Sequence, residues 1–122
     1  MNECAENRQE LAKSFKKFSK VFIALGDENR QQIFITLLKN ENVGMRVPEI
    51  TKQTHLSRPA VSHHLKILRE AGLINMYPVG TMNYYYVDAN ESCWKGLKNF
   101  VDSVDTLVEK ATKAGYPKWE EK

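Results

Sequence analysis

The stretch that most constrains the fold is residues 56–72, which read as one capped helix with two different faces. Ser57 is a good N-cap, Pro59 is tolerated in the first turn of a helix, and Gly72 stands where a C-terminal cap belongs. Apolar residues recur at i, i+4 and i+7 and form one stripe, made of Val61, Leu65 and Leu68. The stretch therefore predicts an amphipathic helix that anchors in a core along one side.

The opposite face of this helix carries cations, hydroxyl groups and imidazoles, with no carboxylate before Glu70. Its residues are Arg58, Ser62, His63, Lys66 and Arg69. Arginine can bond O6 and N7 of guanine in the major groove of DNA, and serine or histidine can bond base edges or phosphate oxygens. The simpler interpretation is an ordinary solvated basic face, and the helix alone does not separate the two.

The segments on either side of this helix favour the DNA-binding interpretation. Residues 47–54 read as a short helix with Pro48 in its first turn, and only a tight turn separates it from the next cap. Two helices joined so closely match a helix-turn-helix. Downstream, β-prone runs at 73–77 and 83–87 flank a turn that contains Gly80, which predicts a hairpin wing.

Three segments of the chain form a more specific pattern. They are Leu-Gly-Asp-x-x-Arg at 25–30, Ser-His-His-Leu-Lys-x-Leu-Arg-Glu-Ala-Gly-Leu at 62–73, and the wing run at 80–86. Together they resemble the ArsR/SmtB-type winged-helix transcriptional regulators, over residues 18–108. The resemblance implies a homodimeric winged helix-turn-helix protein that binds double-stranded DNA, in most members as a repressor.

The chain has 122 residues, enough for one domain with its own core. We expect a mainly α fold with a small β-hairpin wing, in the order α-α-α-α-β-β-α, and a dimer. Asp27 is the expected N-cap of a helix at 28–39, and Met45 with Arg46 is expected as a short strand. The other expected parts are helices at 8–25 and 91–114, the helix-turn-helix at 47–72, the wing at 73–88, and flexible tails at 1–7 and 115–122.

The first and last predicted helices carry wide apolar stripes at helical spacing. Such stripes exceed what one side of a small domain needs, and together with the resemblance they favour a two-fold dimer interface. The residues expected there are Phe15, Phe18, Phe22, Leu97, Val101 and Val104. The alternative is that the two helices only pack on each other.

The charge distribution suits a DNA partner without demanding one. The net charge is +3, and residues 1–87 hold 12 Lys and Arg against 8 Asp and Glu. We expect base contacts from Ser57, Arg58, Ser62 and His63, and phosphate contacts from Gln53, Thr54 and Lys66. The wing tip at 78–83 lacks the Arg or Lys that many family members carry there.

Neither a metal site nor a cofactor site is expected. Metal-sensing members of the family often bind through a Cys-x-Cys that aligns with Arg46 and Pro48 here, and the last helix lacks the histidine that other members use. The adjacent His63 and His64 point about 100° apart on a helix, so they are no chelating pair. The sequence does not name the signal that releases DNA, and an unidentified small-molecule effector is one candidate.

Other functions find less support. Cys4 and Cys93 allow a thiol-based redox switch, although reduced thiols without a role are the simpler interpretation. No phosphate-binding loop, carboxylate pair or nucleophile motif indicates an enzyme. A winged helix that binds another protein remains an alternative. No segment resembles a signal peptide or a membrane span, so a cytoplasmic protein without membrane contact is expected.

Overall fold

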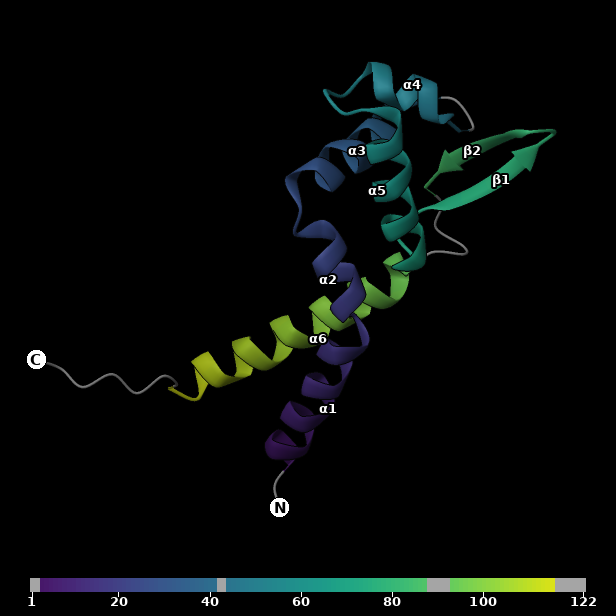
Figure 1. Ribbon diagram of the computed structural model, residues 1–122. Helices are drawn as coiled ribbons and strands as arrows, with labels where there is room; N and C mark the ends of the chain where they lie inside the picture. The colour runs from purple at the N-terminus through teal and green to yellow at the C-terminus, as the bar shows by residue number, and fades with distance from the viewer. Residues whose placement is uncertain (1–2, 42–43, 88–92, 116–122) are drawn as a thin grey trace, which may run out of the picture. The chain divides into compact units, whose positions relative to one another are not determined.

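The computed structural model describes residues 3–41, 44–87 and 93–115. Its elements in chain order are α1 (Glu3–Lys17), α2 (Ser19–Leu25), α3 (Glu28–Lys39), α4 (Val47–Lys52), α5 (Arg58–Glu70), β1 (Asn75–Val79), β2 (Met82–Tyr86) and α6 (Trp94–Lys113) (Figure 1). The chain divides into two compact units. We name them the terminal unit, Met1–Phe18 with Lys95–Lys122, and the central unit, Ser19–Trp94. The predicted mainly α fold with one hairpin is confirmed, whereas the assignment of all 122 residues to one domain stays a prediction.

The core of the central unit is built around α5. Its predicted apolar stripe of Val61, Leu65 and Leu68 is 0% exposed to solvent, and α2, α3 and α4 all pack against this helix. Trp94 also packs on this core: its ring centroid lies 5.2 Å from that of Phe34, and its indole Nε1 donates to the carbonyl oxygen of Leu73 over 3.1 Å. The helix that carries the polar face is therefore fixed by contacts on its opposite side.

Capping residues fix where the helices of the central unit begin and end. The Asp27 carboxylate accepts the backbone N–H groups of Asn29 and Arg30 at 2.8 and 3.1 Å, and these bonds, that of Arg30 foremost, lower the pKa of Asp27. The Ser57 hydroxyl accepts the N–H of Ala60 at 3.3 Å. Gly72 has a φ of +82°, the left-handed conformation that a C-terminal cap needs. All three predicted caps are confirmed.

The wing is a two-stranded antiparallel hairpin that pairs Asn75 with Tyr86 and Val79 with Met82. Its strands differ from the predicted runs at 73–77 and 83–87. For the first strand, the reason is that Leu73 takes part in the turn that ends α5: its N–H donates to the carbonyl of Leu68 over 3.0 Å, and its side chain is buried. The predicted strand at Met45 is a single bridge to Tyr85.

At the N-terminus, two boundaries differ from the prediction. The expected helix at 8–25 is two helices, α1 and α2, interrupted at Phe18, whose N–H is shared between the carbonyls of Ser14 and Phe15. α1 also begins at Glu3, so the prediction that residues 1–7 are an unstructured tail is wrong for 3–7. The predicted tail at 115–122 lies outside the described residues after Gly115.

α4 ends at Lys52, two residues before the predicted end. Thr54 explains the early stop, because its hydroxyl is used in the turn that follows. The hydroxyl donates to the carbonyl of Thr51 and accepts the N–H of Leu56, both over 3.3 Å. The tight turn between the two helices of the helix-turn-helix is therefore stabilised by a side chain.

The terminal unit joins α1 and α6 through aromatic rings. Phe18 and Phe100 are buried, with ring centroids 5.6 Å apart. Phe15 meets Phe100 edge-on at 6.0 Å, yet 56% of its surface stays exposed. Val101 and Val108 on α6 are also exposed. No described helix is both long and apolar enough to span a membrane.

Candidate nucleic-acid interface

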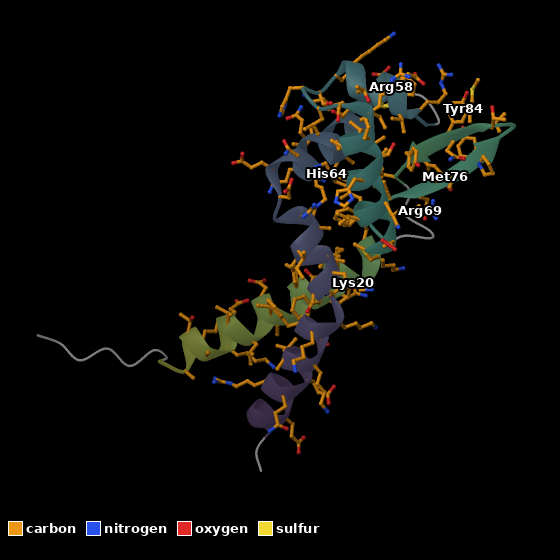
Figure 2. The ribbon with its side chains drawn as sticks, in the orientation of Figure 1. Lys20, Arg58, His64, Arg69, Met76 and Tyr84 are labelled. Carbon is orange, nitrogen blue, oxygen red and sulfur yellow. The ribbon has the colours of Figure 1, made fainter. Side chains whose placement is uncertain are left out.

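The exposed face of α5 carries the side chains that the sequence singled out. Ser57, Arg58, Ser62, His63 and Lys66 are all exposed. Figure 2 shows Arg58 near the start of α5 and Arg69 near its end, with Met76 and Tyr84 on the neighbouring wing. Within the described part of the chain, neither Arg58 nor Lys66 takes part in an ion pair. The helix thus presents uncompensated cations and hydroxyl groups to the solvent.

The turn before α5 contributes two further predicted residues. Gln53 is exposed, and its backbone N–H caps α4 by donating to the carbonyl of Ile50 over 3.0 Å. Thr54 is half-buried, and its hydroxyl is committed to the turn. Gln53 is therefore available to a ligand through its side chain, whereas Thr54 primarily shapes the turn. Their role as phosphate contacts stays a prediction.

His64 faces inward and has a partner that the sequence analysis missed. Its Nδ1 lies 3.3 Å from Nη1 of Arg30. The same guanidinium donates through Nε to the carbonyl of Ala24 over 2.8 Å and through Nη2 to that of Ile23 over 3.2 Å. Arg30 therefore connects the last carbonyls of α2 to α5. The Leu-Gly-Asp-x-x-Arg run carried the signal, but a local pattern does not name a partner 34 residues away.

The surroundings of His64 favour its neutral form. Burial is the largest cause that lowers the pKa of His64, and the positive charges of Arg30 and His63 add to it. The carboxylate of Asp27 opposes them. Neutral His64 can accept a hydrogen bond at Nδ1 from Arg30, whereas protonated His64 repels it. Protonation of His64 therefore disfavours the contact between α5 and Arg30.

We expect stability to fall as the pH is lowered from about 7.5 to 5. The pKa of His64 is lower in the folded than in the unfolded protein, so the unfolded state binds more protons in this range. Urea unfolding at several pH values measures this, and His64→Gln should flatten the dependence. His55→Gln is the control, because His55 is exposed and is not among the groups that shift the pKa of His64, so its loss should leave the slope in place. Parallel curves for wild type and His64→Gln would contradict the expectation.

The wing beside α5 has an aromatic side and an uncharged tip. Tyr77 and Tyr84 stack with ring centroids 5.3 Å apart and an angle of 11° between planes. Residues 75–86 contain no Lys, Arg, Asp or Glu. Val79 and Met82, which flank the turn at Gly80, are exposed. Because the wing lacks cations, only its backbone groups and small polar side chains could contact a phosphate.

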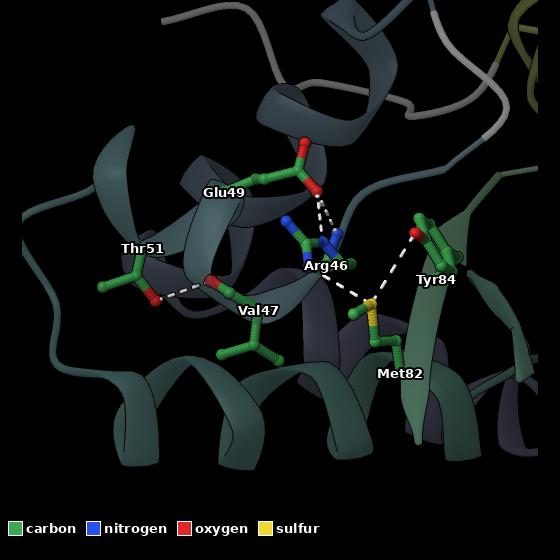
Figure 3. A network of polar contacts seen from close by, with 6 residues as sticks. All are labelled: Arg46, Val47, Glu49, Thr51, Met82 and Tyr84. Atoms are coloured by element: carbon green, nitrogen blue, oxygen red, sulfur yellow. Dashed lines mark hydrogen bonds and ion pairs between the residues drawn. The ribbon is translucent and has the colours of Figure 1, made fainter. Parts of the chain in front are cut away.

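Arg46 lies at the start of α4 and reaches the wing (Figure 3). Its backbone N–H and its Nε both donate to Oε1 of Glu49, at 3.2 and 3.0 Å. Its Nη1 lies 3.2 Å from Sδ of Met82 on β2. The two bonds from Arg46 to Glu49 lower the pKa of Glu49, and the bond from the Arg46 side chain has the larger effect. The sequence analysis gave Arg46 two other interpretations: part of a short strand, and a position where metal-binding relatives carry cysteine.

The six residues predicted for a dimer interface differ in exposure. Phe15 and Val101 are exposed on the terminal unit, whereas Phe18 is buried there against Phe100. The remaining three are half-buried: Phe22 in the central unit, and Leu97 and Val104 on α6. The interface itself stays a prediction.

The two cysteines considered for a redox switch are placed only in part. Cys93 is half-buried, and its burial raises the pKa of its thiol, which disfavours the reactive thiolate. Cys4 lies in α1, but its side chain is outside the described residues. Among the described residues, no three His, Cys, Asp or Glu side chains come together to hold a metal ion.

Together, the described helices and hairpin define a winged helix-turn-helix protein. The model of bacterial regulatory proteins of the arsR family matches residues 27–76. The chain is 36% identical over 93 residues to a helix-turn-helix transcriptional regulator of Methanocaldococcus jannaschii, covering 76% of this chain and 97% of that protein. It is 31% identical over 87 residues to the transcriptional repressor SdpR of Bacillus subtilis, covering 70% and 93%. The protein belongs to the ArsR family and is a DNA-binding transcriptional regulator.

A solved structure supports the same fold. The homodimeric winged helix-turn-helix DNA-binding domain of a Mycobacterium bovis protein, solved in solution, superposes with a TM-score of 0.58. The match covers 91% of this chain and 92% of that domain, with 21% sequence identity. At this identity the likeness shows the fold.

Proposed function

We propose that the protein is a homodimeric repressor that reads a near-palindromic operator with α5 of each protomer. One observation carries the proposal: α5 buries its whole apolar stripe and exposes a polar face rich in cations and free of carboxylates before Glu70. A helix fixed in this way can enter the major groove as a rigid body. The family relative SdpR is a repressor, which supports repression here.

The residues of this face are assigned by their position along the helix. In helix-turn-helix proteins, the N-terminal residues of the second helix contact base edges. Ser57, Arg58, Ser62 and His63 are therefore proposed to contact bases. Residues that lie beside the groove contact the backbone, and we assign Gln53, Thr54 and Lys66 to phosphates.

Replacing Lys66 with alanine tests the phosphate assignment. Each phosphate contact by a cation releases counterions, so the variant should bind all duplexes more weakly and its salt slope should fall by about one. The measurement is the dissociation constant for a random-sequence duplex over a range of KCl concentrations. Lys13→Ala, which removes an exposed lysine of α1, is the control and should keep the slope. An unchanged slope for Lys66→Ala would remove Lys66 from the phosphate contacts.

A dimer is proposed through α1 and α6. Phe15, Val101 and Val108 are exposed apolar residues on these helices, and a protein of the same fold is a homodimer. We expect light scattering at micromolar concentration to give the mass of two chains, and Val101→Glu to shift it towards one chain. The mass of one chain for wild type would contradict the dimer.

The proposal also covers the location of the protein and the signal that releases it from DNA. A DNA-binding regulator acts where the DNA is, so we place the protein in the cytoplasm. Release from the operator by a small-molecule effector, and a redox role of Cys4 and Cys93, stay predictions. If wild type binds no duplex at low salt, a winged helix that binds another protein becomes the better interpretation.

A further inference from the structure

The wing lacks the charge with which it could hold a phosphate, but the fold brings a cation to it from elsewhere. Residues 75–86 are uncharged, and Met82 and Val79 at the tip are exposed. Arg46, 36 residues before Met82, places its Nη1 3.2 Å from the Met82 sulfur. Figure 3 shows the guanidinium between Glu49 of α4 and Met82 of β2.

The guanidinium of Arg46 is held in a fixed place and still has N–H groups that can donate to a ligand. Its Nε is bonded to Glu49, and 37% of its side chain is exposed. Its Nη2 donates to no atom within residues 3–41, 44–87 and 93–115. Met82 is itself positioned, because the hydroxyl of Tyr84 donates to its sulfur over 3.9 Å. An arginine immobilised in this way loses little side-chain entropy when it binds an anion.

The position of Arg46 in the helix-turn-helix indicates which anion it meets. The first helix of this motif crosses the DNA backbone while the second lies in the groove. Arg46 stands immediately before that first helix, α4, on the side where the wing lies. We propose that Arg46 binds a DNA phosphate and supplies the cationic contact that the wing lacks, with Glu49 as the residue that positions its guanidinium. This inference rests on the proposed binding of DNA by α5.

Glu49 has two opposite effects in this arrangement. Its carboxylate fixes the direction of the guanidinium, and its negative charge offsets part of the attraction to phosphate. A glutamine at this position can still accept the N–H groups of Arg46 through its amide oxygen, as in a capping box. Removal of the charge alone should therefore strengthen DNA binding, which a purely structural role of the pair does not predict.

The experiment measures the dissociation constant of the full chain for a random-sequence duplex between about 50 and 200 mM KCl. Arg46→Ala should bind more weakly and lose about 0.9 of the salt slope, while Arg46→Lys should keep most of the slope. Glu49→Gln should bind severalfold more tightly than wild type. The matched controls are Lys98→Ala and Asp102→Asn, which make the same charge changes in the exposed i,i+4 pair of α6.

The outcomes separate this inference from the function on which it rests. If wild type binds the duplex but Arg46→Ala and Lys98→Ala have the same slope, the phosphate contact is overturned and DNA binding by α5 stands. If Glu49→Gln binds no more tightly than Asp102→Asn, the contact is likewise overturned, even where Arg46→Ala is poorly folded. If wild type shows no salt-dependent binding, the proposed function and this inference fall together.

Discussion

Replacing Leu65 with alanine should lower the free energy of unfolding by about 2–5 kcal/mol. Leu65 is the middle residue of the α5 stripe, is fully buried, and lies in a helix that packs against α2, α3 and α4. The loss combines the transfer free energy of the removed methyl and methylene groups with that of the cavity left behind. Urea unfolding followed by circular dichroism measures it.

Leu38 provides the matched control for Leu65. It belongs to the same unit, at the end of α3, but 58% of its surface is exposed. Leu38→Ala should therefore change the free energy of unfolding by about 0.5 kcal/mol or less. Similar losses for the two variants would show that α5 is not anchored as described. DNA affinity of Leu65→Ala should fall as well, because the recognition helix loses its fixed orientation.

Arg58→Ala should reduce discrimination between an operator and a scrambled duplex by about 1–3 kcal/mol. Arg58 is the first residue of α5, exposed, and follows the Ser57 cap directly. Its planar guanidinium can bond O6 and N7 of one guanine together. Affinity for the scrambled duplex should change little, because that binding depends on phosphate contacts. The measurement is a pair of dissociation constants, one for each duplex, at the same salt concentration.

Arg58→Lys distinguishes a base contact from a phosphate contact. Lysine keeps the charge but not the planar pair of donors, so it should lose most of the discrimination that alanine loses. A phosphate contact needs only the charge, so in that case Arg58→Lys would be nearly silent. Equal losses on both duplexes for Arg58→Ala would assign Arg58 to the DNA backbone.

The parts of the fold that were predicted correctly depend on residues close in sequence. The caps Asp27 and Ser57 bond N–H groups two or three residues away, and the stripe of α5 follows from helical spacing. Gly72 needs only the conformation of its own backbone. These features therefore appear in the sequence as patterns, and the exposed face of α5 follows from the buried one.

The parts that were missed depend on contacts between distant residues. The contact of Arg30 with His64 joins α3 to α5, and that of Arg46 with Met82 joins the start of α4 to the wing. A local pattern cannot identify such partners, so neither the contact of Arg30 with His64 nor that of Arg46 with Met82 was predicted. The prediction for Leu73 was wrong for a local reason: its β propensity was considered without the turn that ends α5, in which its N–H donates to the carbonyl of Leu68.

Selection of bound duplexes from a random library tests most directly whether α5 reads DNA sequence. Two recognition helices in successive major grooves predict a near-palindromic site whose half-sites are about 10–10.5 base pairs apart, centre to centre. The account predicts that wild type enriches such a site. Arg58→Ala should enrich it less, or should lose the base preference at one position of each half-site. Recovery of an unenriched library by wild type, at a salt concentration where it binds DNA, would contradict sequence reading by α5.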